Sequence, residues 1–167
     1  MKRVLQVLAV LVVLVALGAG WYVYSKQPTR QGTVTLANLQ GSVTVRYDDR
    51  GVPHIRAENE ADLYRALGFV HAQDRLFQME IMRRLARGEL AEVLGPKVLE
   101  TDKLFRSLRI RDRAATYVAQ LDHESAHWKA LQAYLDGINQ YQHTHASPVE
   151  FDVLGIPKRP FTAEDSI

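Results

Sequence analysis

The chain has 167 residues, and its 21 Lys and Arg side chains nearly balance its 19 Asp and Glu side chains. Without Lys2 and Arg3 at the N-terminus the two signs are equal in number, so the composition indicates no basic surface of the kind that binds nucleic acid. The absence of cysteine excludes disulfides, thiolate metal sites and a cysteine nucleophile.

An apolar run at residues 4–24 follows the two basic residues, and Gln6 is its only strongly polar side chain. The run is longer than the roughly 7–15 residues of a cleavable signal core and close to the ~20 that span a bilayer. Trp21 and Tyr24 lie where interfacial aromatic residues are expected, and the preceding positive charges place the N-terminus in the cytoplasm. We therefore predict that residues 1–24 are an uncleaved signal anchor, with a removed signal peptide as the alternative. Both interpretations export the rest of the protein, to the periplasm in a Gram-negative bacterium.

A polar linker is predicted at residues 25–41, which contain one proline and two glycines. Residues 43–47 alternate between apolar and polar side chains, as a strand with one buried face does. Asp, Arg and Gly in residues 48–51 favour a turn, and residues 52–57 return as a second short strand that contains a proline. The sequence therefore predicts a β-hairpin.

A long helix is predicted after the hairpin. Asn59 is a good N-cap, and the helix is expected to run to about Arg87 and to end at Gly88. Its larger apolar side chains recur at the alternating three- and four-residue spacing of one helical face. They are Leu63, Leu67, Val70, Phe77 and Ile81.

Asp74 occupies a position on this apolar stripe. Because a buried carboxylate is costly unless it is paired, we predict a partner for it, either Arg75, Arg83 or Arg84 or a residue on another segment. His71 lies three residues before Asp74, which is a spacing that could give an acid–base pair. A structural role for both residues is the simpler interpretation, since buried ionic networks also contain such pairs.

Further helices are predicted toward the C-terminus, with no strand among them. A short helix over residues 89–94 and a longer one over 108–121 are expected, while residues 98–107 stay unassigned. Asp122 is expected to cap the next helix, and residues 148–160 are expected to be extended or turning. The inner stripe of the helix after Asp122 is predicted to be Trp128, Leu131, Leu135 and Ile138.

The last residues predict the start of another helix. Thr162 is a good N-cap and Asp165 completes a capping-box pattern with it. A single turn of helix has no stability of its own, because nucleation costs more than one turn returns. The chain is therefore expected to be a fragment, or a piece completed by another polypeptide.

Residues 123–127 read His-Glu-Ser-Ala-His, which matches the H-E-x-x-H pattern of zinc proteases. In that pattern two histidines share one helical face and bind zinc while the glutamate acts as a general base. Here the pattern adjoins the expected cap at Asp122 and its neighbours are polar, so the simpler interpretation is an exposed first turn.

Ser42 follows a glycine, and a serine hydroxyl can act as a nucleophile when a base lies beside it. A turn glycine followed by a serine that opens a strand is the simpler interpretation. The other serines are not in a Gly-x-Ser-x-Gly context, and they are Ser25, Ser107, Ser125, Ser147 and Ser166.

Three phrases carry a resemblance to a known family: GVPHI at residues 51–55, GFVHAQDRLFQMEIMRR at 68–84 and GELAEVLG at 88–95. Together they resemble the start of the alpha subunit of the penicillin acylase family, whose members are N-terminal-nucleophile (Ntn) amidohydrolases. The resemblance is strongest over residues 43–110. It continues more weakly to Ile167 through YLDGIN and PVEFDVLGIP.

The resemblance implies an α+β protein: a mainly helical alpha-subunit fragment with a short β-hairpin, part of a four-layer αββα sandwich when complete. On this interpretation residues 42–167 are the N-terminal part of the alpha subunit, and Arg83, Arg84 and Arg87 form a solvated face or contact the partner subunit. The family's precursors are cut into alpha and beta subunits. The N-terminal Ser of beta attacks the amide carbonyl, with its own α-amino group as the base, and the resemblance places Ser42 far upstream of that junction. Calcium is bound by ligands mostly in beta and by one acidic residue of alpha, which comes after the segment that resembles PFTAEDSI.

No catalytic, cofactor-binding or metal residue is therefore assigned to this chain, and the chain alone is expected to be inactive. The expected partners are a beta subunit from the same precursor, an acyl-amide substrate and the membrane through residues 4–24. Two rival interpretations remain open: a membrane-anchored helical binding or scaffold protein, and a zinc protease built on residues 123–127.

Overall fold

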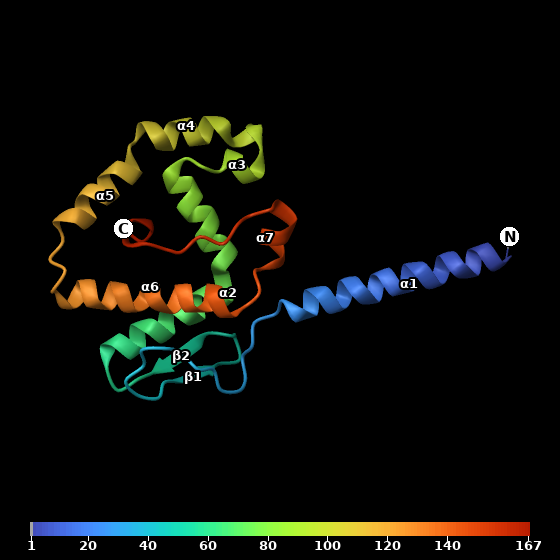
Figure 1. Cartoon of the computed structure of the whole chain (residues 1–167), viewed down its shortest axis with the longest axis horizontal. Helices are drawn as coiled ribbons and strands as arrows, with labels where there is room; N and C mark the ends of the chain where they lie inside the picture. The colour runs from blue at the N-terminus through green and yellow to red at the C-terminus, as the bar shows by residue number, and fades with distance from the viewer. Residues whose placement is uncertain (1) are drawn as a thin grey trace.

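The computed structural model describes residues 2–167 (Figure 1). Helix α1 projects from one side of the molecule, and the remaining elements form the body. In chain order the elements are α1 (Lys2–Ser25), β1 (Thr44–Tyr47), β2 (Pro53–Arg56), α2 (Glu60–Arg87), α3 (Ala91–Leu94), the 3-10 helix η1 (Pro96–Val98), α4 (Leu99–Ser107), α5 (Ile110–Gln120), α6 (Ala126–Thr144), α7 (Val149–Leu154) and the 3-10 helix η2 (Ala163–Asp165). The predicted class, mainly helical with one two-stranded hairpin, is confirmed.

The hairpin is antiparallel, and its register pairs Val45 with Ile55 and Tyr47 with Pro53. Asp48 shapes the turn, because its Oδ1 accepts hydrogen bonds from the backbone N–H groups of Arg50 and Val52, each at 2.9 Å. Proline is tolerated here since it stands at the first position of β2.

Helix α2 has the predicted ends. The Asn59 side chain accepts a hydrogen bond from the Asp62 N–H at 2.9 Å, and Gly88 ends the helix in the left-handed conformation with φ 65°. Inside the helix, Arg75 has φ −145° and ψ 30°, which are not helical values. The two halves of α2 therefore run in different directions (Figure 1), and the sequence pattern did not predict this kink.

The core lies where α2 crosses α6 and where the C-terminal segment packs back onto both. The buried face of α2 is centred one residue before the predicted stripe, on Ala66, Phe69, Leu76 and Glu80. Of the predicted positions, Val70 is buried, whereas Leu63, Leu67, Phe77 and Ile81 are only half-buried at the edge of this face. The inner stripe of α6 is as predicted, with Leu135 and Ile138 buried.

Three predictions for the C-terminal half need correction: the cap of α6, the extended segment at residues 148–160 and the helix that follows Thr162. Helix α6 begins at Ala126 with Ser125 as its N-cap, so Asp122 does not cap it. Helix α4 occupies most of the segment left unassigned, and α7 lies in the segment expected to be extended. The predicted capping box is present, because Thr162 N–H donates to Asp165 Oδ2 at 3.0 Å, but the turn that follows is a 3-10 helix.

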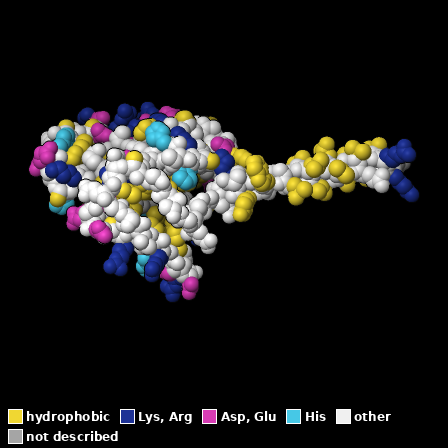
Figure 2. Space-filling view, turned by 60° about the horizontal axis from the view of Figure 1, so that its bottom comes forward, with side chains coloured by type: hydrophobic (Ala, Val, Ile, Leu, Met, Phe, Trp, Pro, Cys, Tyr) yellow, Lys and Arg dark blue, Asp and Glu magenta, His cyan; other side chains and the backbone are white. Residues whose placement is uncertain are grey.

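Helix α1 is exposed along its whole length. It has 24 residues, and an 18-residue stretch of it has a mean hydropathy of 2.5, so it is long and apolar enough to cross a membrane, as a signal sequence near an N-terminus also is. Figure 2 shows apolar side chains along this helix and basic ones at its free end. The segment between α1 and β1 is fastened to the body, since the backbone N–H groups of Gln40 and Gly41 donate to the Asp62 carboxylate at 3.0 and 2.9 Å.

Candidate functional site

His71 and Asp74 are each bonded to a different partner. The Asp74 carboxylate binds the guanidinium of Arg75 at 2.8 Å, and its side chain is 43% exposed. The prediction of a buried carboxylate at Asp74 is therefore wrong, because the buried face of α2 does not pass through this position. His71 Nδ1 lies 3.1 Å from the Tyr134 hydroxyl, and burial lowers the pKa of His71, which keeps it neutral near pH 7. Both residues have structural partners.

The buried carboxylate of α2 belongs to Glu80, which is fully enclosed. Its Oε1 accepts a hydrogen bond from Arg84 Nε at 2.7 Å, and its Oε2 is paired with Arg83. Arg83 and Arg84 are themselves buried, so the prediction that they form a solvated face is wrong. Glutamate followed by arginines at i+3 and i+4 is the sequence signal that could have revealed this group.

This ionic cluster joins three parts of the chain. Arg83 Nη1 donates to the backbone oxygen of Pro160 at 3.0 Å, and Arg84 Nη1 lies 2.9 Å from the carboxylate of Glu92. Arg87, predicted to be solvated with the other two, is largely covered and pairs with Asp165 at 2.6 Å. Removing one member of a buried pair leaves an uncompensated charge, so the cluster holds the C-terminal segment at one position on α2.

The His-Glu-Ser-Ala-His pattern does not form a zinc site. His123 and Glu124 lie in the turn before the cap, so the two histidines do not share a helical face. His123 stacks on Trp128 with ring centroids 4.1 Å apart, and Glu124 pairs with Lys129 at 3.0 Å. Over residues 2–167, no three His, Asp or Glu side chains gather into a group that could hold a metal ion.

Ser42 lies just before β1, on the rim of a hollow of about 470 Å³ that also includes His54. The hairpin register places His54 opposite Arg46, so Ser42 is about 13 Å away along the strand at ~3.3 Å per residue. His54 instead lies 3.3 Å from the carboxylate of Asp48. The hairpin does not assemble a Ser-His-Asp triad.

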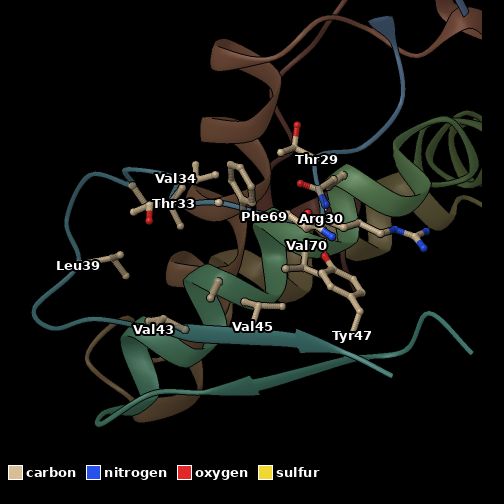
Figure 3. A pocket seen from close by; sticks show the side chains of 15 residues that line it. Thr29, Arg30, Thr33, Val34, Leu39, Val43, Val45, Tyr47, Phe69 and Val70 are labelled. Atoms are coloured by element: carbon tan, nitrogen blue, oxygen red, sulfur yellow. Dashed lines mark hydrogen bonds between the residues drawn. The ribbon is translucent and has the colours of Figure 1, made fainter. Parts of the chain in front are cut away.

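A cavity of about 210 Å³ lies between the segment that follows α1, β1 and the first half of α2 (Figure 3). Its walls are mostly apolar and include Val45, Phe69 and Val70. At its polar side the guanidinium of Arg30 lies 5.4 Å from the centre of the Tyr47 ring, and Gln73 Nε2 donates to the Tyr47 hydroxyl at 3.2 Å. The cavity can hold a small apolar group, but these side chains include no acid–base pair.

A second hollow, of about 360 Å³, adjoins the kink of α2. Exposed Met82 and half-buried Met79 contribute apolar surface, and exposed Arg75 contributes charge. The side chains of Phe161 and Asp165 also line the hollow but are buried. Interfaces between proteins combine apolar anchors and charged groups in this way. This hollow is therefore the candidate contact surface of the chain for another polypeptide.

The comparisons with known proteins agree on one family. The sequence profile described as Penicillin amidase matches residues 42–167, which is the body of the molecule. The penicillin acylase 2 proenzyme of Pseudomonas sp. (strain SE83) is 42% identical over 144 residues, which cover 84% of this chain and 18% of that proenzyme. The acyl-homoserine lactone acylase QuiP of Pseudomonas aeruginosa is 33% identical over 144 residues, which cover 83% of this chain and 16% of that enzyme.

A solved structure agrees with the sequence comparisons. A thermostable penicillin G acylase from Alcaligenes faecalis superposes with a TM-score of 0.63 at 31% identity, covering 75% of this chain and 68% of that chain. The chain spans less than a fifth of the length of the curated relatives described above. The family match extends over residues 42–167, and the chain belongs to the penicillin amidase family.

Proposed function

We propose that this chain is the N-terminal part of the alpha segment of an exported amidohydrolase, which cleaves the amide bond between an acyl group and an amine. The observation that carries the proposal is the family match over residues 42–167, supported by the superposition on a penicillin G acylase. One relative is named a proenzyme, which is consistent with a precursor that is processed before it acts.

The proposed chemistry lies outside this chain. An N-terminal serine of a beta segment attacks the amide carbonyl, and its α-amino group takes the hydroxyl proton and passes it to the leaving amine. The tetrahedral intermediate, stabilised by hydrogen-bond donors of beta, collapses to an acyl-enzyme. Water then cleaves this ester, releases the acid and restores the serine. Calcium, if the complete enzyme holds it, is proposed to have its ligands in that remaining part.

The role proposed for this chain is to supply a rigid part of the scaffold. Glu80 and the arginines beside it fix the C-terminal segment on α2, and this segment borders the hollow near Met82. A beta segment packed against that hollow would cover the exposed apolar surface. The relatives are named for penicillin and for acyl-homoserine lactones, so the proposed substrate class is a linear amide of a carboxylic acid on a lactam- or lactone-bearing amine.

The location proposed for the enzyme is the periplasm, with α1 as an anchor in the inner membrane. The positive charges at its start and the aromatic residues at its end support this orientation. The body then lies on the exported side, where small amide substrates that cross the outer membrane arrive.

The proposal is tested by expressing the complete reading frame and the 167-residue chain side by side. Release of p-nitroaniline from a panel of acyl p-nitroanilides, and of acid from an acyl-homoserine lactone, is measured for both. The complete product is expected to be cut into two polypeptides and to hydrolyse at least one amide, while the 167-residue chain gives only the background rate. A complete product that is cut and folded yet hydrolyses none of these amides would contradict the proposal.

A further inference from the structure

The C-terminal end of α1 and the residue that follows it are bonded to α7, which lies more than a hundred residues later in the chain. Lys26 Nζ donates to Asp152 Oδ2 at 2.7 Å, and the Tyr22 hydroxyl also bonds this carboxylate. The Lys26 ammonium lies 5.1 Å from the centre of the Tyr22 ring. In Figure 1, α7 accordingly stands beside the end of α1 from which the chain enters the body.

The exposure of these side chains indicates a packed contact. Tyr22 is 37% exposed, whereas its neighbours Trp21 and Tyr24 are each 72% exposed. The side chain of Lys26 is only 14% exposed, which is low for a lysine. The hydrogen bond from Lys26 also lowers the pKa of the Asp152 carboxyl, so the pair is charged at neutral pH.

This contact fixes the position of α7 along the axis of α1. Aromatic residues such as Trp21 and Tyr24 lie at the level of lipid headgroups when a helix spans a bilayer. Because α7 is bonded to Tyr22 and Lys26, it is then held at the depth of the lipid headgroups. Val153, next to Asp152 in α7, is 76% exposed, which is more than any other large apolar side chain of the described residues.

We propose that α7 is a membrane-contacting helix: the Lys26–Asp152 contact holds it against the headgroup layer, and Val153 contacts the lipid. The partner is the surface of the bilayer that α1 spans, so the inference requires that α1 is retained. Glu150 on the same helix is exposed, and its charge keeps α7 at the headgroup level and out of the hydrocarbon core. The contact thereby gives the body one orientation relative to the membrane, instead of several orientations about the segment that joins α1 to β1.

The test uses the absence of cysteine, which makes any introduced cysteine unique. Val153→Cys is labelled with an environment-sensitive fluorophore in the full chain, reconstituted in vesicles of phosphatidylethanolamine and phosphatidylglycerol. Quenching by lipids that carry a shallow nitroxide is compared with quenching at Tyr117→Cys. Tyr117 is also exposed and lies on α5, on the side of the body away from α1 (Figure 1).

At least twofold stronger quenching is expected at position 153 than at position 117. Lys26→Ala, added to Val153→Cys, is expected to remove most of that difference while the protein still sediments with the vesicles. Equal quenching at the two positions, an unchanged signal after Lys26→Ala, or recovery of a body that has lost α1 would each overturn the proposal. Because quenching is independent of amide hydrolysis, its failure is distinct from a failure of the proposed enzyme activity.

Discussion

Gly68 and Gly137 mark the point where α2 and α6 touch backbone to backbone. A Cβ atom added at Gly68 would lie 1.9 Å from the Tyr134 carbonyl oxygen, and one added at Gly137 would lie 1.9 Å from the Arg65 carbonyl oxygen. Both glycines lie inside helices, so the reason for glycine here is the close approach and not an unusual backbone conformation.

Gly137→Ala is expected to destabilise the body. Alanine favours a helix over glycine by about 1 kcal/mol, but the clash is with backbone, which cannot move aside as a side chain can. Overpacking of this kind costs about 1–3 kcal/mol, so we expect a lower melting temperature by circular dichroism. The control is Gly41→Ala, whose added Cβ meets nothing closer than a Glu58 carboxylate oxygen at 3.6 Å. Equal melting temperatures for the two variants would contradict the close crossing.

Glu80→Gln is expected to lower the free energy of unfolding by about 3 kcal/mol, because Arg83 and Arg84 lose the buried carboxylate that lies between them. As acidic partners, Arg83 then keeps only Asp165 at 3.5 Å, and Arg84 keeps only the exposed carboxylate of Glu92. Urea denaturation of the full chain in detergent micelles measures the loss. Glu100→Gln is the matched control, since that glutamate pairs with Lys103 on the surface and its loss should change stability by less than ~1 kcal/mol. A loss below 1 kcal/mol for Glu80→Gln would show that the cluster does not hold the fold.

Asp136 gives the fold a dependence on acid pH. Burial acts to raise its pKa, but hydrogen bonds from Arg65, Gln140 and Asn38 outweigh this effect and hold the pKa below the usual 3.8. The stabilisation is therefore fully present above pH 3.8 and is lost as the pH falls below that value through the folded-state pKa.

Asp136→Asn is expected to lower stability by about 1 kcal/mol at pH 7 and to flatten the loss of stability below pH 4. Thermal melting between pH 7 and pH 3 measures both effects. Asp112→Asn, which removes an exposed carboxylate paired with Arg109, is the control and should leave the pH profile as in the parent chain. An unchanged acid profile in Asp136→Asn would refute the assignment.

His127→Ala is expected to leave zinc content and stability unchanged, since His123 stacks on Trp128 outside the helix that carries His127. Metal analysis of the purified chain after incubation with zinc, followed by gel filtration, decides this point. One zinc ion per chain that disappears in His127→Ala would restore the protease interpretation.

Features set by neighbouring residues could be predicted from the sequence. The cap at Asn59, the end of α2 at Gly88 and the capping box at Thr162 and Asp165 each depend on a few adjacent residues. The N-cap of α6 is predicted at the wrong residue because Asp122 and Ser125 are both good cap residues. Asp122 instead accepts a hydrogen bond from the Glu124 N–H and forms a turn.

The buried face of α2 could not be placed correctly because small and charged residues make up much of it, beside Phe69, Val70 and Leu76. Gly68 and Ala72 lie at the close crossing with α6, but such small side chains contribute little to a hydropathy pattern. Glu80 is buried only because two arginines neutralise its charge. Of the larger apolar residues that define the periodic pattern, only Val70 is buried, and the other four lie at the edge of the contact. Because the buried face is displaced by one residue, the pattern predicts a buried carboxylate at Asp74, whereas Glu80 is the one that is buried.

Identification of the residue that forms the acyl-enzyme tests the central claim, which is that this chain provides scaffold and the nucleophile lies elsewhere. The mature, complete enzyme is treated with a reagent that sulfonylates active serines, and mass spectrometry locates the modified residue. The account predicts a modified N-terminal serine on a second polypeptide, and no modification of this chain. Stoichiometric modification of any of its six serines, Ser42 included, with loss of activity would contradict it.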